Sequence, residues 1–165
     1  MQIKVAVVGA GSMGMNHLRV LKDFDEEQLQ LVGVAESYAP VLKQAVGRFH
    51  IPGFADYRQM IEQLRPDLVA VVVPTHLHFE VAAFVLSQGI NVLIEKPFTQ
   101  TIEEGQRLLE LARIHNVKIA VGHVERFNPA VVELKRQLQA GALGNMFYLH
   151  ARRIGPFPPA FAMSG

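Results

Sequence analysis

Short continuous runs of apolar residues alternate along the chain with stretches in which apolar residues recur every three or four positions. The continuous runs predict strands that are covered on both faces, and the spaced patterns predict amphipathic helices. The predicted strands are 3–8, 29–35, 68–73, 91–94 and 117–121. The helices predicted between them are 13–22, one that starts near Pro40, 57–64, 79–87, and one that begins with a capping box of Thr101 and Glu104.

Five strands joined by crossover helices predict an α/β fold: a Rossmann, doubly wound parallel sheet with helices on both faces. The first helix is expected to turn one face inward, carrying Gly14, His17, Leu18 and Leu21, with His17 interpreted as an ordinary residue of that face. The helix after Thr101 is expected to bury Gly105, Leu108, Leu109 and Ala112.

The pattern changes after Gly122, so a domain boundary is predicted there, with 1–122 as one domain and 123–165 as the beginning of a second. Asn128 and Pro129 are typical of a helix start. The stretch 145–154 is interpreted as the first strand of a new sheet. An unpaired strand tends to pair with another chain, so this segment is expected to be disordered or docked on a neighbour. The tail 155–165 is too rich in proline for regular structure.

The first predicted strand runs straight into Gly9-Ala10-Gly11-Ser12-Met13-Gly14. A G-x-G-x-x-G turn between a strand and a helix is the pattern that binds the pyrophosphate of a dinucleotide. Gly9 allows the sharp turn, Gly11 lets the phosphate approach the backbone, and Gly14 lets the helix pack closely on the strand. The unpaired N–H groups of the helix N-terminus favour an anion.

Glu36 ends the second predicted strand, 22 residues after Gly14. An acid at this place accepts hydrogen bonds from the adenosine ribose hydroxyls and repels a 2′-phosphate, which favours NAD over NADP. The alternative is an ordinary solvated carboxylate.

Composition narrows the functional classes. The 165 residues are half hydrophobic, with a formal net charge of +1. That charge gives no electrostatic reason to expect nucleic acid or a membrane surface as a partner. The absence of cysteine excludes disulfides and fits a reducing compartment. No export signal and no apolar run of about 18 residues is recognisable, so a cytoplasmic location is expected. His76 and His78 are poorly spaced for a metal, and no metal site is expected.

Three blocks of sequence resemble the Gfo/Idh/MocA family of oxidoreductases. These are 9–14, Pro74-Thr75-His76-Leu77-His78, and 89–97, which ends in Glu95-Lys96-Pro97. The stretches 121–129 and 152–158 resemble members that oxidise the 3-hydroxyl of UDP-N-acetylglucosamine and related sugars. The similarity covers about residues 1–159.

The resemblance implies a role for each matching residue. The pyrophosphate is expected to be bound by Gly9, Gly11, Ser12, Met13 and Gly14. The adenosine ribose is expected to be bound by Glu36 and Ser37. Pro74, Thr75 and His78 are expected to line the cofactor cleft, and Glu95 and Lys96 to flank the nicotinamide ribose. Lys96 is also the expected catalytic residue, while His123, Arg126 and Asn128 are expected near the substrate, a sugar or UDP-sugar.

Some of these residues also have structural interpretations that involve no ligand. Lys96 and Glu95 are also typical of a surface ion pair, which is worth little. His78 also fits a hydrogen bond at a helix start, His123 a packed histidine, and Arg126 a solvent-facing cation.

Family members are about twice as long, and the second half supplies an Asp/His acid–base pair and the sheet that builds the substrate pocket. The resemblance therefore implies the cofactor-binding half of a sugar dehydrogenase, followed by the start of a truncated α+β second domain. A non-catalytic nucleotide-binding or interaction module is the alternative. A homo-oligomer that completes a site between chains is a further expectation.

Overall fold

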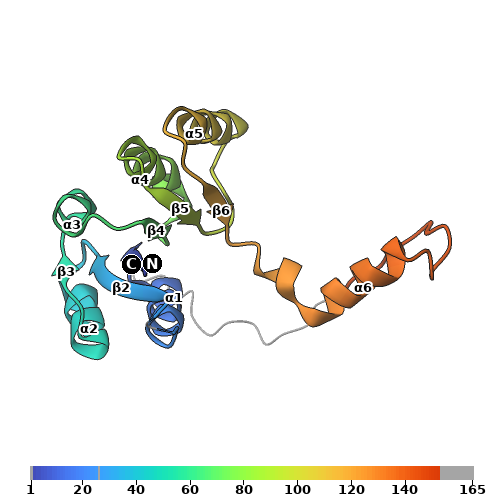
Figure 1. The fold of residues 1–165 in the computed structure, drawn as a ribbon, viewed down its shortest axis with the longest axis horizontal. Coiled ribbons are helices and arrows are strands. Elements are labelled where there is room, and N and C mark those ends of the chain that lie inside the picture. The colour runs from blue at the N-terminus through green and yellow to red at the C-terminus, as the bar shows by residue number, and fades with distance from the viewer. Residues whose placement is uncertain (1, 26, 153–165) are drawn as a thin grey trace, which may run out of the picture. The chain divides into compact units, whose positions relative to one another are not determined.

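The computed structural model describes residues 2–25 and 27–152, and it divides the chain into two compact units at His123/Val124. The first unit alternates strands and helices (Figure 1). Its strands are β1 Ile3–Val8, β2 Leu29–Ala35, β3 Gly53–Phe54, β4 Leu68–Val71, β5 Asn91–Ile94 and β6 Ile119–Val121. Its helices are α1 Ser12–Lys22, α2 Ala39–Phe49, α3 Tyr57–Leu64, α4 Thr75–Ser87 and α5 Ile102–Ile114.

All six strands are parallel and lie in the order β3-β2-β1-β4-β5-β6. The order reverses at β1, where the chain crosses from one half of the sheet to the other. Helices α1 and α2 pack on one face, and α3, α4 and α5 pack on the other (Figure 1). The predicted Rossmann sheet is therefore confirmed, and its first switch point lies between β1 and β4.

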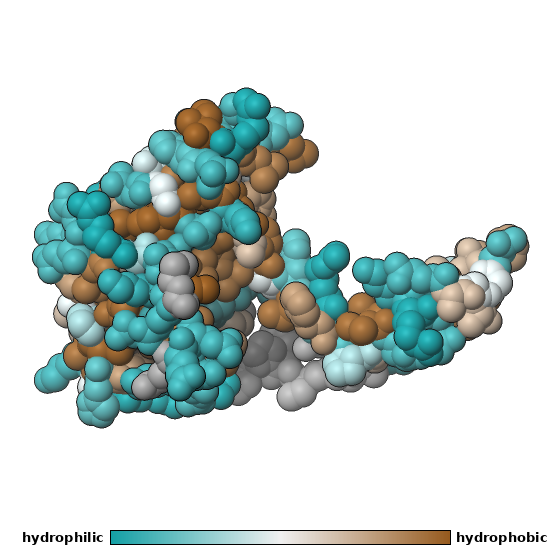
Figure 2. All heavy atoms as spheres, in the orientation of Figure 1, coloured by the Kyte–Doolittle hydropathy of each residue, from teal (hydrophilic) through white to brown (hydrophobic). Residues whose placement is uncertain are grey.

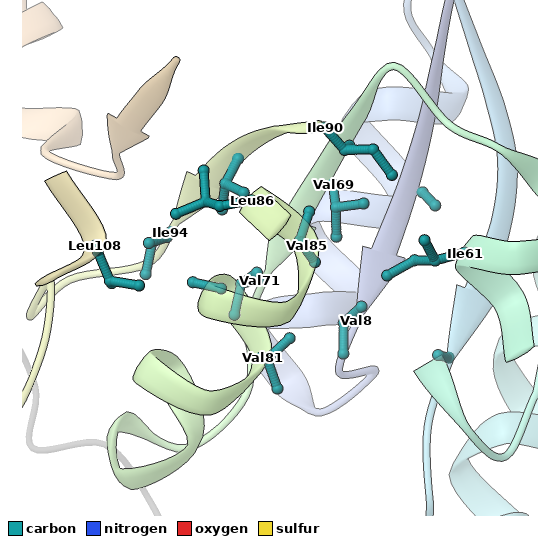
Figure 3. Packing of buried hydrophobic residues seen from close by; sticks show 14 of the residues in the cluster. Val8, Ile61, Val69, Val71, Val81, Val85, Leu86, Ile90, Ile94 and Leu108 are labelled. Atoms are coloured by element: carbon teal, nitrogen blue, oxygen red, sulfur yellow. The ribbon is translucent and has the colours of Figure 1, made fainter. Parts of the chain in front are cut away.

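The larger part of the core lies between the sheet and helices α3 to α5. Val81 and Val85 of α4 face Val8 and Val71 of β1 and β4 in this layer (Figure 3). Leu108, which lies on α5, is fully buried at the end of the same cluster. Continuous apolar strands thus fill both faces of the sheet, as expected of a parallel sheet under helices.

One strand was not predicted, and three boundaries differ from the prediction by two residues or more. Strand β3 was not predicted, because only Gly53 and Phe54 form it and Pro52 precedes them. Strand β4 ends at Val71 rather than Val73, and α4 begins earlier than predicted, since Pro74 serves as its N-cap. Strand β6 begins at Ile119 because the N–H of Val117 donates to a carbonyl of α5 and that of Lys118 donates to the Asn91 side chain.

Helix α5 confirms one prediction and corrects another. Thr101 and Glu104 form the reciprocal capping box. Gly105, Leu108 and Ala112 are buried, but Leu109 is 58% exposed, so its predicted burial is wrong. Leu109 lies one position beyond Leu108, which turns it about 100° away from the sheet.

The second unit contains the 3-10 helix η1 (Val124–Phe127) and helix α6 (Pro129–Gln139). Asn128 caps α6, as predicted, by accepting a hydrogen bond from the N–H of Ala130 at 3.0 Å. The strand predicted over 145–154 is wrong for residues 145–152, which form no ladder; the described part of the second unit contains no other strand with which their backbone could pair. Residues 153 and 154 and the tail 155–165 lie outside the described residues.

No helix in the described part of the chain has the length and apolar character needed to cross a membrane.

Candidate functional site

The carboxyl ends of the parallel strands bring the predicted site residues to one edge of the sheet. Gly9 follows β1, Glu36 follows β2, Pro74 follows β4 and Glu95 follows β5. A cleft of about 590 Å³ lies at this edge. Of the predicted cofactor residues it is lined by Gly9, Gly11, Glu36, Ser37 and Pro74. Clefts at this edge, beside the switch point, are where open α/β sheets bind ligands.

A second hollow, of about 530 Å³, lies at the opposite edge. Lys4 and Leu29, near the amino ends of β1 and β2, contribute to its lining. It contains none of the predicted site residues, so the cleft at the carboxyl ends is the candidate site.

The glycine turn has three different reasons for lacking side chains. Gly9 has φ +96°, and a Cβ there would lie 2.4 Å from the Val72 carbonyl oxygen. A Cβ on Gly14 would lie 2.1 Å from the Gly9 carbonyl oxygen, so the first turn of α1 packs directly on the strand end. Gly11 has φ −60°, and no protein atom lies within 4 Å of a Cβ built on it. The protein's own packing excludes a Cβ at Gly9 and Gly14 but not at Gly11, where glycine suits both the N-cap of α1 and the close approach of a ligand.

The N-terminus of α1 has no side-chain cap, as is also true of α2 and α4, whereas α3, α5 and α6 are capped by Asp56, Thr101 and Asn128. Its first turn is formed by Ser12, Met13 and Gly14, and it contains no acidic residue. Backbone N–H groups at a helix start carry partial positive charge and attract an anion. A bare helix start behind a cradle without Cβ atoms fits a diphosphate.

The Glu36 carboxylate is hydrogen-bonded to the glycine turn and to the backbone after β2. Its Oε2 accepts a hydrogen bond from the Ala10 N–H, and its Oε1 accepts one from the Tyr38 N–H, both at 2.9 Å. The carboxylate is thus fixed at the rim of the cleft, where Ser37 lies beside it. A carboxylate oxygen has capacity for further bonds, so each oxygen can still accept one from a ribose hydroxyl.

A charged cluster forms another part of the cleft wall. Nη2 of Arg58 lies 2.7 Å from Oε1 of Glu80, and the Tyr57 hydroxyl donates to the same oxygen at 3.3 Å. The Arg58 guanidinium also lies 4.5 Å from the centroid of the Tyr57 ring. Burial raises the pKa of Tyr57 to about 12, and the bond to Glu80 raises the pKa of Arg58. These residues were not predicted, because they lie in and beside a short helix that carries no recognised motif.

Glu95 is 9% exposed, and its carboxylate is held from two sides. His17 of α1 donates from Nε2 to Oε1 at 2.8 Å, and the Lys96 N–H donates to Oε2 at 3.1 Å. A Cβ on Gly122 would lie 3.0 Å from the same Oε1, so β6 also packs closely against this carboxylate. Lys96 itself is exposed at the end of β5.

The sequence placed His17 on the inward face of α1 but gave no partner for it. The only signal was its spacing, three residues after Gly14, which turns it toward the sheet. The structure shows that His17 joins the helix behind the glycine turn to the loop that carries Lys96.

His78 is 1% exposed, so it lies beneath the surface rather than on it. Its Nδ1 lies 2.9 Å from the Pro97 carbonyl oxygen, and its Nε2 lies 3.0 Å from the Val73 carbonyl oxygen. The ring therefore ties the end of β4 to the loop after Lys96. Its neighbour at the start of α4, Thr75, is half-buried.

His123 does not line the cleft, and the other two predicted substrate residues belong to the second unit. His123 is exposed at the end of the first unit. Arg126 and Asn128 belong to the second unit, where Arg126 is exposed and Asn128 caps α6 and donates to Glu125 at 3.0 Å. Their substrate roles stay predictions.

Comparison with known proteins supports the same kind of site. Residues 3–123 match GFO_IDH_MocA, the oxidoreductase family with an NAD-binding Rossmann fold. The chain is 32% identical over 157 residues to UDP-N-acetylglucosamine 3-dehydrogenase of Acidithiobacillus ferrooxidans, covering 95% of this chain and 47% of the relative. It is 29% identical to scyllo-inositol 2-dehydrogenase (NAD(+)) of Bacillus subtilis over 161 residues, covering 96% and 47%.

Among solved structures, the chain resembles the WlbA dehydrogenase of Chromobacterium violaceum in complex with NADH and UDP-GlcNAcA. The TM-score is 0.82 at 28% identity, and the match covers 87% of this chain and 41% of that one. The chain therefore spans about half the length of the relatives it matches.

Proposed function

Because the chain belongs to the GFO_IDH_MocA family of oxidoreductases with an NAD-binding Rossmann fold, we propose that it binds NAD at the carboxyl edge of its sheet. We propose further that it is the cofactor-binding half of a dehydrogenase acting on the CH–OH group of a sugar or UDP-sugar. The observation that carries the first proposal is the glycine cradle with its uncapped helix. The relatives named above, which include two sugar or UDP-sugar dehydrogenases, support the second.

The residues present fit the cofactor. The N–H groups of Ser12, Met13 and Gly14 face the pyrophosphate, which Gly9 and Gly11 allow to approach the backbone. Glu36 and Ser37 take the adenosine ribose. The fixed Glu36 carboxylate disfavours a 2′-phosphate by charge repulsion, so NAD is the proposed cofactor rather than NADP.

Pro74, Thr75, His78, Glu95 and Lys96 occupy the edge of the sheet on the far side of the switch point from Glu36. We assign the nicotinamide half of the cofactor to this side. His78 acts there by holding the loop after Lys96, rather than by direct contact, since its ring nitrogens are used by carbonyl oxygens.

Lys96 is the proposed catalytic residue. When bound, NAD supplies a hydride acceptor. The Lys96 ammonium donates a hydrogen bond to the reacting carbinol oxygen and stabilises the negative charge that develops there, while the hydroxyl proton is assigned to the Asp/His acid–base pair that the family resemblance implies in the second half of its members. His123, Arg126 and Asn128 are assigned to the substrate side on the same family grounds.

Calorimetric titration with NAD tests the cofactor proposal. We expect saturable binding and a rise in the melting temperature. No heat and no thermal shift at millimolar NAD would contradict it. Formation of NADH in the presence of UDP-N-acetylglucosamine, abolished by Lys96→Met, tests the catalytic proposal and distinguishes an enzyme from a non-catalytic binding module.

We also propose that the protein self-associates. Phe127, Phe147 and Tyr148 are each at least 80% exposed in the second unit, and Figure 2 shows apolar side chains among the polar ones of this unit. Exposed apolar groups of this size are typical of a contact surface. Sedimentation velocity tests this: a single monomeric species at all concentrations would refute it.

A further inference from the structure

Four charged side chains line the cleft beside the Glu36 rim. Glu36, Asp56 and Glu80 are acidic, and among the described residues that line the cleft Arg58 is the only cation. Three carboxylates and one guanidinium leave a formal charge of −2. Asp56 is occupied as the N-cap of α3, where its Oδ1 accepts from the Arg58 N–H at 2.8 Å.

The single cation is already paired with a carboxylate. Glu80, which lies on α4, takes the Arg58 guanidinium at 2.7 Å, and the ring of Phe84 from the same helix lies 5.5 Å below it. The Tyr57 ring contacts it from another side. Both charged groups are about half exposed, so nothing in the packing requires this pair. An exposed ion pair contributes little to stability, and its position in the cleft calls for another explanation.

We propose that Glu80 is a second determinant of cofactor choice, acting with Glu36: by pairing with Arg58 it removes the one cation with which the cleft could bind a 2′-phosphate. This inference rests on the proposed function. NADP differs from NAD by a dianionic phosphate on the adenosine ribose, and arginine is the side chain that best binds phosphate through paired hydrogen bonds. With Glu80 present, the guanidinium is neutralised, and the carboxylate adds its own repulsion.

The test compares NADPH and NADH binding to the whole chain, measured by calorimetry or by nicotinamide fluorescence. Glu80→Gln keeps the size of the side chain and a hydrogen-bond acceptor for Arg58 but removes the charge. We expect the ratio of the NADPH to the NADH dissociation constant to fall by about fivefold or more. Glu80→Ala is expected to shift the ratio in the same direction.

Two further variants separate the cause. Arg58→Gln combined with Glu80→Gln is expected to lose most of the gain, because the phosphate then has no cation to bind. Glu110→Gln is the matched control: Glu110 is also an exposed carboxylate paired with an arginine, at 2.9 Å, but it lies on α5 and does not line the cleft. It is expected to leave the ratio unchanged.

A ratio within twofold of the unsubstituted chain in both Glu80 variants, while NADH still binds, would overturn the inference and leave the proposed function standing. A gain of undiminished size without Arg58 would also overturn it. If the unsubstituted chain binds neither nucleotide, the proposed function itself fails, and the inference with it.

Discussion

Gly11→Ala is the substitution that best distinguishes an effect on ligand binding from an effect on folding. A Cβ on Gly11 meets no protein atom within 4 Å, and the residue's φ of −60° suits alanine. The same change at Gly9 or Gly14 places a methyl group 2.4 or 2.1 Å from a backbone oxygen. One substitution made at three positions of a single turn therefore has two different expected outcomes.

The cost to the fold is worked from these contacts. At Gly11 alanine is a poorer N-cap than glycine by about 0.5–1 kcal/mol, and the loss of unfolded-state freedom returns about 0.4–1 kcal/mol. The free energy of unfolding should thus change by less than about 1 kcal/mol. At Gly14 the overlap costs about 1–3 kcal/mol or more. At Gly9 the positive φ adds about 1–3 kcal/mol of backbone strain.

The effect on NAD binding is clearest at Gly11, where the effect on folding is smallest. On Gly11 the new methyl group occupies the approach of the pyrophosphate to the helix N–H groups. We expect NAD affinity to fall at least about tenfold, which corresponds to about 1.4 kcal/mol. Calorimetric titration measures the affinity, and urea unfolding followed by circular dichroism measures the stability of the same preparation.

Gly47→Ala is the matched control for this experiment. Gly47 is exposed in α2, and a Cβ there also meets nothing within 4 Å. It should gain up to about 1 kcal/mol of stability from helix propensity and bind NAD unchanged. If Gly11→Ala binds NAD as tightly as the unsubstituted chain, the pyrophosphate does not lie at this turn and the assignment of the site is wrong.

Three further results are expected. His17→Leu should lower the free energy of unfolding by about 1–3 kcal/mol, because the buried Glu95 carboxylate loses the one side-chain donor it has among the described residues, and His17→Gln should recover part of it; equal losses in both variants would contradict this. Thr101→Ala should cost about 1 kcal/mol by removing the capping box, measured by the same denaturation, and no change would refute that cap. Since burial raises the pKa of Tyr57 from 10.0 to about 12, the stabilisation it provides is complete below pH 10 and lost as the pH rises to about 12. Tyr57→Phe should remove this decline, and a phenol that titrates near its ordinary pKa by ultraviolet absorbance would contradict the burial argument.

Much of the fold follows from local pattern alone. Strands β1, β2 and β5 agree with their predicted bounds because each is a mainly apolar run that is followed by a glycine or by a charged residue. Strand β3 was missed because two residues carry no periodicity, and it exists only through hydrogen bonds to its neighbour β2. The error at 145–152 has the same origin: a strand-like pattern does not make a strand without a partner.

Some residues of the candidate site were predicted from local sequence patterns and others were not, for the same reason. The motif residues were predicted because glycines and a terminal acid have local signatures that the strand order then brings together. His17 and the Arg58–Glu80 pair were not, since their partners lie 78 and 22 residues away in sequence and no short motif records such a contact. Long-range side-chain pairing depends on which helices pack on which face, and this is decided only by the folded chain.

The His17–Glu95 bond gives the two halves of the proposed site a physical connection. The helix that begins at the pyrophosphate cradle carries His17, and the loop that carries Lys96 begins at Glu95. His78 anchors the other end of that loop to β4 through the Pro97 and Val73 carbonyl oxygens. The partly buried His17 and the buried His78 thus hold the lysine-bearing loop against α1 and α4, the helices on either side of the switch point. The Glu95 carboxylate, left in so little water without the His17 donor, would cost stability. The His17 contact therefore both stabilises the loop and fixes the backbone from which the Lys96 side chain extends.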